Sequence, residues 1–345
     1  MKKGLCRIAL PVAIIILLIF LSLGGCRKVT NPVKYQYGTF PDSVYILDGL
    51  NSAYDDFGIN GGSGNTSTDP AHILITSIPV IFSSNRGSNG SQADLLSGSI
   101  NFQFDQTNGK FEVNGVTTSD AFYTAIVNKA NSSGNEYSPY TQFINSDGYE
   151  YLFYSSDQTG GQLDLFYERY LPRNGNNLPV ISGPYAITRL NSASDDAYVT
   201  MNSRMDSVYF CSDRGGNYDI FVQPDTVLTP FSTWLGGSYQ TSFLADSLNS
   251  SGNDKCPFIF RNIMVFASDR AGGLGGYDLY YSVFRNGKWN APVNFGPGIN
   301  TSSDEFSPVV GYTGEFTNRL LVFSSNRPGG KGGYDLYFTG YNFPN

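Results

Sequence analysis

Short apolar segments alternate with polar turns along most of this chain, and the same pair of segments recurs five times. The first segment of a pair is apolar and ends in small or polar residues, as in Val265-Phe266-Ala267-Ser268. The second segment begins at an aspartate, as in Asp278-Leu279-Tyr280. Short runs of aromatic and β-branched residues between glycine-rich or polar turns are typical of strands joined in hairpins. The pattern therefore predicts an all-β chain built from repeated strand pairs.

The spacing of the repeat predicts the size of each unit. A motif of Asn-Ser or Asn-Thr and a polar turn precedes each pair, and in the last two copies a further strand begins near Pro257 or Pro308. Residues 287–295 predict an outer strand. Four strands in about 56 residues match one blade of a β-propeller. The serine that ends the first segment recurs at steps of 72, 56, 56 and 57 residues, as Ser84, Ser156, Ser212, Ser268 and Ser325.

The phase of the repeat predicts how the propeller closes. The last copy ends at residues 334–338, which form the third strand of a blade and have no fourth strand after them. Residues 42–47 precede the first Asn-Ser motif, where a fourth strand belongs. The two ends therefore complete one blade, and closure removes the open sheet edges. We expect a five-bladed propeller of four-stranded blades closed by the N-terminal strand. Six blades are the alternative if the long first step contains a degenerate blade.

The N-terminus predicts secretion and lipidation. Lys2, Lys3 and Arg7 precede an apolar run that ends in Leu23-Gly24-Gly25-Cys26, an order typical of a secretory signal peptide. The last four residues resemble the lipobox of bacterial lipoproteins, which implies that Cys26 is acylated. An uncleaved membrane anchor is the alternative. We expect a signal peptide at 1–25, a lipidated tether at 26–41 and the propeller at 42–345, in the cell envelope, at the outer membrane facing the periplasm.

Charge and cysteine content narrow the classes of partner and cofactor. Without the signal peptide the chain has 19 basic and 29 acidic residues, a formal charge of −10, which argues against a nucleic-acid partner. Cys211 and Cys256 could form a disulfide in an oxidising compartment, or Cys211 could fill a small-residue position of the repeat. Two cysteines and one histidine make a Cys/His metal site improbable, and we expect no cofactor and no metal. Ca²⁺ bound by the acidic turns is the alternative.

The polar residues of the repeat predict structural roles, because five copies of a turn need the same hydrogen bonds whereas an active site is needed once. Asp and Asn side chains bond turn amides, and Arg pairs with carboxylates. The residues assigned to this structural set are Asp157, Asp164, Asp213, Arg214, Asp219, Asp269, Arg270, Asp278, Asn326, Arg327 and Asp335.

The units Ser-Asp-Arg-x-Gly-Gly and Tyr-Asp-Leu-Tyr, with Asn300-Thr301-x-x-Asp304-Glu305, resemble the WD-like propeller repeat of TolB-type envelope proteins. The resemblance covers residues 45–340 and is strongest in the last two copies. In the second copy Gln158 replaces the arginine. The resemblance implies a periplasmic binding platform.

Binding is expected where the rim departs from the repeat, because propellers display binding residues on loops of a rigid scaffold. The candidates are Tyr54, His72, Tyr137 and Phe306. His72 is the only histidine, and it follows Asp69-Pro70-Ala71 at the predicted start of the first blade's inner strand. The chain lacks the Gly-x-Ser-x-Gly motif of a hydrolase beside it, so no catalytic residue is assigned. We expect a monomeric, non-enzymatic scaffold that binds an envelope protein or peptidoglycan. The alternative is a glycan-binding or glycan-cleaving propeller.

Overall fold

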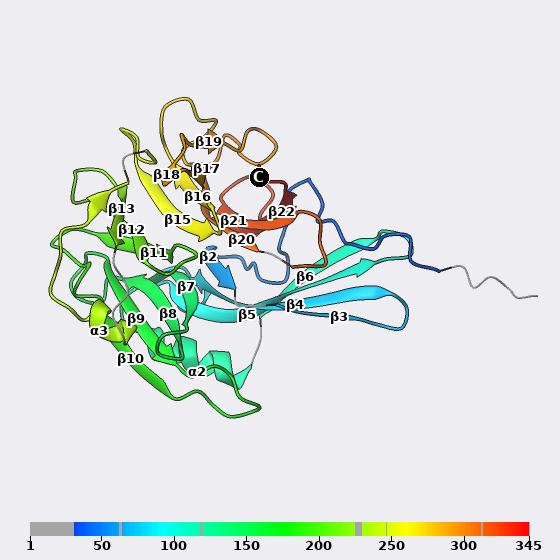
Figure 1. Ribbon diagram of the computed structural model, residues 1–345, viewed down its shortest axis with the longest axis horizontal. Coiled ribbons are helices and arrows are strands. Elements are labelled where there is room, and N and C mark those ends of the chain that lie inside the picture. Colours follow the sequence, from blue (N-terminus) through cyan, green and yellow to red (C-terminus); the bar gives the residue numbers. More distant parts are fainter. Residues whose placement is uncertain are drawn as a thin grey trace, which may run out of the picture.

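Five antiparallel sheets are arranged around a common axis in the computed structural model (Figure 1). The structure describes residues 31–61, 64–117, 120–224, 230–245, 247–311 and 313–344. Each sheet is one propeller blade whose first strand lies at the axis, and later strands lie progressively farther out. The prediction of five blades is confirmed, and the long first step contains no sixth sheet among the described residues.

Three of the blades are uninterrupted in sequence. Blade 2 contains β7 (Glu136–Ile144), β8 (Tyr149–Ser156), β9 (Asp164–Tyr170) and β10 (Ile181–Ala186). Blade 3 contains β11 (Asp196–Met201), β12 (Ser207–Ser212), β13 (Asp219–Pro224) and β14 (Phe243–Leu244). Blade 4 contains β15 (Asp254–Phe260), β16 (Ile263–Ser268), β17 (Asp278–Arg285) and β18 (Lys288–Trp289), and β19 (Val293–Asn294) also pairs with β17.

Blade 5 joins the two ends of the chain. It contains β20 (Glu305–Gly311), β21 (Arg319–Ser325), β22 (Asp335–Tyr341) and, as its outer strand, β1 (Tyr45–Ile46). Tyr45 pairs with Phe338 and Ile46 with Tyr337, in antiparallel register. The predicted closure by an N-terminal strand is therefore confirmed.

Blade 1 is extended into a long arm. Its strands are β2 (Asp56–Gly61), β4 (Ile73–Ser84), β5 (Asp94–Asp105) and β6 (Phe111–Thr117), and β3 (Asn65–Thr68) pairs with the outer half of β4. A 3-10 turn, η1 (Arg86–Ser88), connects β4 to β5. Strand β4 has 12 residues, against six to eight in the second strands of the other blades. The extra length projects from the propeller body as the arm in Figure 1.

The inner strands share a bulge that brings the backbone toward the axis. In each inner strand the pairing register shifts between the second and the fifth residue. The third residue has a left-handed backbone, with φ between 45° and 62°, in all five blades. A bulge with this geometry bends and twists its strand, which suits a strand that lines a narrow axis. The five residues are Gly58, Ser138, Tyr198, Cys256 and Ser307.

Hydrogen bonds between blades repeat around the ring. The amide of Gly58 donates to Ser324 Oγ of blade 5, and the amide of Ser138 donates to Ser83 Oγ of blade 1, both at 3.1 Å. The first asparagine of every Asn-Ser or Asn-Thr motif also bonds both the N–H and the C=O of one residue in the preceding third strand. Asn300, for example, binds Leu279 at 2.8 and 3.0 Å. These bonds explain why the motif recurs once per blade.

Among the described residues, two α-helices lie outside the strand pattern, and neither was predicted from the sequence. Helix α2 (Ala121–Ala130) begins at Asp120, whose carboxylate accepts the amides of Phe122 and Tyr123. It lies within the long interval of 72 residues between Ser84 and Ser156. Its buried face, which includes Phe122 and Ile126, packs on blades 1 and 2. Helix α3 (Phe231–Leu235) packs its Trp234 into the core of blades 2 and 3. No described helix is long and apolar enough to cross a membrane.

Candidate functional site

The acidic residues of the Ser-Asp-Arg turns bond neighbouring turns of the same blade. Asp157 accepts the amide of Asn135 at 2.7 Å, and Asp269 accepts the amide of Asn253 at 2.6 Å. Asp213 and Asn326 do the same for the amides of Asp195 and Asp304. The aspartate that begins each third strand accepts hydrogen bonds from the turn before it. Asp278 and Asp335 accept from backbone amides. Asp164 and Asp219 accept from the side chains of Thr159 and Asn217.

The arginines of these turns are largely buried and each forms an ion pair with the first residue of an inner strand. Arg214 pairs with Asp196, Arg270 with Asp254 and Arg327 with Glu305, the last pair at 3.0 Å. Each guanidinium also donates to the carbonyl before the blade's Asn motif. Because the three carboxylates are fully buried, these pairs hold the turns in place and present no free acid to solvent.

The predicted rim residues separate into two groups. Tyr137 and Phe306 both occupy the second position of an inner strand, at the upper mouth of the axial channel, where we define "upper" as the side of the Ser-Asp-Arg turns. There the ring of Phe306 contacts Tyr277 at 5.3 Å and Tyr198 at 6.0 Å, and Tyr137 contacts Phe57 at 5.8 Å between ring centroids. The upper mouth is therefore lined by half-buried aromatic rings.

Tyr54 and His72 lie away from this mouth. The Tyr54 hydroxyl donates to Asn89 at 3.2 Å, in the outer turns of blade 1. His72 was placed at the start of an inner strand in the sequence analysis, and this placement was wrong, because the inner strand of blade 1 is β2. His72 lies in the turn before β4, at the far end of the arm, with φ of 64°. The structure thus brings together two of the four predicted residues.

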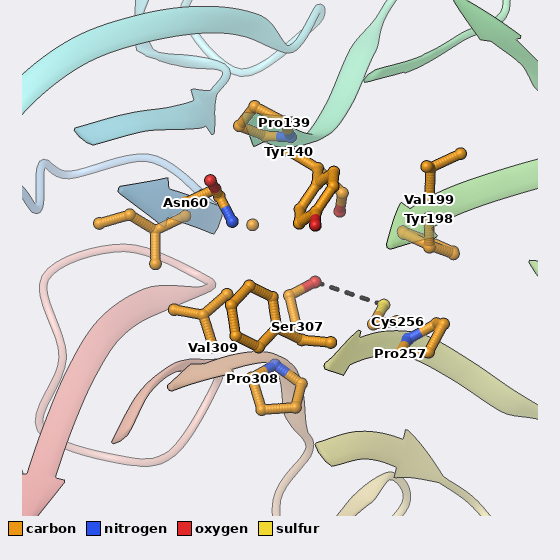
Figure 2. Close-up of a pocket in the computed structure, with 14 residues that line it drawn as sticks. Asn60, Pro139, Tyr140, Tyr198, Val199, Cys256, Pro257, Ser307, Pro308 and Val309 are labelled. Atoms are coloured by element: carbon orange, nitrogen blue, oxygen red, sulfur yellow. Dashed lines mark hydrogen bonds between the residues drawn. The ribbon is translucent and has the colours of Figure 1, made fainter. Parts of the chain in front are cut away.

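The axial channel is narrow in its middle (Figure 2). The bulge residues and the prolines after them, Pro139, Pro257 and Pro308, surround a cavity of about 30 Å³. This volume is about that of one water molecule. Ser307 donates to Cys256 Sγ at 3.4 Å across this constriction. Both Cys211 and Cys256 are buried free thiols, so the disulfide left open by the sequence does not form.

The lower mouth of the channel widens into a cavity of about 410 Å³, which we call the funnel. It is lined by the ends of inner strands, by the base of the arm and by the second strands of blades 2 and 5. Aliphatic side chains such as Ile78 and Val322 form much of its wall, and three phenylalanines, Phe143, Phe258 and Phe260, add aromatic surface. Phe143 is 39% exposed. This site was not predicted from the sequence.

Glu150 supplies the only carboxylate among the described residues that line the funnel. It is half-buried on β8, and burial raises the pKa of its carboxyl group above the usual value. Within the part of the chain that the structure describes, this carboxylate has no hydrogen-bond or ion-pair partner, in contrast to the acids of the turns. Functional sites commonly contain a titratable group whose pKa is perturbed and which lies in a cleft.

Neutral polar groups lie beside this acid in the lining. Asn60 accepts two hydrogen bonds from Thr141, from its amide at 3.1 Å and from its hydroxyl at 3.0 Å. These bonds fix the orientation of the Asn60 side chain, whose nitrogen points toward the channel in Figure 2. Gln142 accepts from the Tyr140 hydroxyl at 3.1 Å and donates to the carbonyl of Phe143. The funnel therefore combines an oriented amide, a carboxylate and aromatic surface.

No group of three or more His, Cys, Asp or Glu side chains in the described ranges is arranged to hold a metal ion. The funnel lining likewise contains one carboxylate and no histidine or cysteine. Its chemistry is thus that of hydrogen bonding by one carboxylate and neutral amides, together with apolar contact.

Comparisons with known proteins give fold similarity alone. No protein-family model matches the chain, and the search of curated proteins gives no match. An endo-arabinase from Bacteroides thetaiotaomicron VPI-5482 is 14% identical, with a TM-score of 0.47, over 90% of this chain and 98% of its own. A thermostable family-43 glycoside hydrolase is 12% identical, with a TM-score of 0.47, over 83% and 91%. An α-L-arabinofuranosidase from Podospora anserina, solved with cellotriose, is 11% identical, with a TM-score of 0.44, over 91% and 99%.

These comparisons correct the resemblance on which the functional prediction was based. The assignment to TolB-type repeats was wrong, and with it the prediction of a non-enzymatic scaffold: the three solved structures named above are glycoside hydrolases. The physical reason is that the shared motifs occupy turns and strand ends, which bond to one another in every blade. Residues at such positions are those that a blade of this geometry requires, so they do not identify a family. At these identities the similarity transfers no residue role.

Proposed function

We propose that the protein recognises a glycan in the funnel at the lower mouth of the propeller. The observation that carries the proposal is the unpartnered Glu150 carboxylate in a cavity of about 410 Å³ that also contains an oriented amide and aromatic surface. Small-molecule sites commonly have volumes of about 300–1,000 Å³ and combine apolar walls with a few polar groups.

The chemistry of the lining suits a sugar ring. Sugar hydroxyls donate well to a carboxylate such as Glu150 and accept from an amide N–H such as that of Asn60. A hydrogen bond to a charged group contributes about 1.5–3 kcal/mol. The C–H faces of the ring can be covered by Phe143 and Phe258, because aromatic side chains offer flat apolar surface.

The shape of the channel favours a chain end over a chain that passes through. The funnel is continuous with the constriction of about 30 Å³, which Tyr140 and Pro308 help to fill. A sugar residue is far larger than the water-sized space that remains. A glycan would therefore enter from the lower side and stop, with its terminal one or two residues in the funnel.

Glycan cleavage is a second candidate, favoured by the raised pKa of Glu150. A carboxyl group whose pKa is raised by burial can act as the general acid of a glycosidase. The usual mechanism also requires a second carboxylate, which the described lining does not supply. The geometry thus supports recognition better than hydrolysis.

The test compares Glu150→Gln with the wild-type chain. Titration calorimetry with xylotriose, cellotriose and soluble peptidoglycan fragments should give binding of at least one glycan, and Glu150→Gln should weaken it about 10- to 100-fold, the equivalent of one charged hydrogen bond. Glu112→Gln is the matched control, because Glu112 is an exposed acid on the arm. Unchanged affinity in Glu150→Gln would contradict the proposed site. Release of reducing ends by the wild type, lost in Glu150→Gln, would favour cleavage.

A further inference from the structure

The N-terminal segment, residues 31–41, lies along the arm of blade 1 before the chain enters the propeller. The amides of Lys34 and Tyr35 both donate to the carbonyl of Gln106, at 2.9 and 3.0 Å, and the Gln106 side chain donates to the carbonyl of Gln36. Gln106 lies in the turn between β5 and β6, at the far end of the arm. The segment then reaches blade 5, where Phe40 bonds Asn318. Figure 1 shows this path from the end of the arm back to the body.

These contacts hold Lys34 at the far end of the arm, eight residues after Cys26, which the sequence predicts to be lipidated. Five peptide steps separate Cys26 from Asn31, so the two cannot lie more than about 18 Å apart. Strand β1, by contrast, is reached only after the segment has returned along the whole arm. Lipid attached to Cys26 would therefore lie near the far end of the arm and not near the blades.

The exposed residues at this end suit the surface of a bilayer. Tyr35 and Tyr37 are 47% and 50% exposed, and tyrosine is enriched at the membrane–water interface. Residues 26–41 contain three basic residues, Arg27, Lys28 and Lys34, and no acidic residue, although the mature chain as a whole has a charge of −10. Each basic residue near an anionic surface contributes about 1 kcal/mol of attraction. The acidic propeller body would be repelled from the same surface.

We propose that the end of the arm, with residues 34–37, rests on the lipid headgroups and holds the propeller at a fixed distance from the membrane. The turns at 69–72 and 106–110 face the bilayer, and the Ser-Asp-Arg rim faces away from it. The additional four to six residues of β4 correspond to a separation of about 13–20 Å. The proposal rests on acylation of Cys26 and is independent of what the funnel binds.

The experiment places one fluorophore at each end of the acylated, full-length protein. Ala71→Cys lies in an exposed turn at the end of the arm, and Ser302→Cys lies in an exposed turn on the opposite rim. Native Cys211 and Cys256 are buried, so labelling is selective. The protein is reconstituted in vesicles of phosphatidylethanolamine and phosphatidylglycerol (3:1) that contain a nitroxide-headgroup lipid.

We expect quenching at least threefold stronger at position 71 than at position 302. A combined Lys34→Glu, Tyr35→Ser and Tyr37→Ser variant should remain attached to vesicles through its acyl chains yet lose most of this difference. Equal quenching at the two positions, or an unchanged difference in the combined variant, would overturn the proposal. So would purified protein that carries no acyl chain and fails to float with vesicles.

Discussion

At the scale of single residues, Glu168 on β9 differs from the other buried acids. Its side chain is fully buried, and neither carboxylate oxygen has a hydrogen-bond partner. Burial raises the pKa of Glu168 from 4.5 to about 8, and the nearby positive charge of Lys129 lowers it only in part. The acid is therefore protonated in the folded protein at neutral pH, when an unfolded chain would have it ionised.

This difference predicts a fall in stability with rising pH. The folded state binds more protons than the unfolded state between pH 4.5 and about 8, so the stabilising contribution is fully present below pH 4.5 and is lost as pH rises to about 8. Each unit of pKa difference corresponds to about 1.4 kcal/mol. We expect Glu168→Gln to melt at a higher temperature than the wild type at pH 9, and the difference to shrink at pH 5. The same difference in melting temperature between variant and wild type at pH 5 and at pH 9 would contradict the prediction.

Single-residue chemistry was also where the sequence was least informative. The repeat identifies turn acids because they recur, whereas Glu150 and Glu168 occur once and lie in strands rich in tyrosine. Neither carboxylate has a hydrogen-bond partner among the described residues. Whether a carboxylate has one depends on the side chains packed around it, and those side chains come from other strands, other blades and helix α2. No spacing along one strand encodes such an encounter.

At the scale of elements, blade 2 departs from the arrangement that the other blades share. In blades 1, 3, 4 and 5 an arginine pairs with the acid that begins the inner strand and stacks on a phenylalanine of the second strand. Blade 2 has Gln158 and Tyr154 at these positions. Its acid, Glu136, bonds Ser132 and Ser156 through one oxygen, and its second oxygen is buried without a partner.

Restoring the shared arrangement should stabilise blade 2. In the double variant Gln158→Arg with Tyr154→Phe, a guanidinium would satisfy the second oxygen of Glu136, and we expect a gain of about 1–3 kcal/mol in the free energy of unfolding. Urea denaturation monitored by tryptophan fluorescence measures it. Asn176→Arg, at an exposed position between β9 and β10, controls for added charge. A double variant no more stable than the wild type would show that a guanidinium at position 158 does not pair with Glu136.

Most elements could be predicted because their sequence patterns repeat, and the elements that were missed lie where the pattern does not repeat. Strands of the Ser-Asp-Arg and Tyr-Asp units alternate with turn residues in five copies, so each copy supports the others. Helix α2 and strands β5 and β6 lie in the long step between Ser84 and Ser156, and β3 and β4 precede Ser84, so neither part of the arm has a second copy for comparison. His72 was misplaced for this reason, since β4 begins well outside the repeat unit.

At the scale of the whole molecule, closure depends on a very short strand. Only Tyr45 and Ile46 pair with β22, and Leu47 adds one further bond to Leu336 and is buried. Without them the edge of β22 is open. Deletion of residues 42–47 should lower the free energy of unfolding by about 3 kcal/mol or more, since it removes a buried leucine as well as the pairing, and should promote association through the free edge. Thermal melting and size-exclusion chromatography test both effects. A monomer with the wild-type melting temperature would contradict this role of β1.

The path of residues 31–41 also determines how the molecule responds to mechanical load. Tension applied at the N-terminus reaches the Gln106 bonds at the end of the arm first, and then the buried Phe40 ring, stacked on Phe316 at 4.2 Å between centroids. Only after these contacts fail does the force act on β1. Under the proposed lipid anchor, the contacts of the arm would therefore break before tension reached Tyr45 and Ile46, the two residues whose pairing closes the ring.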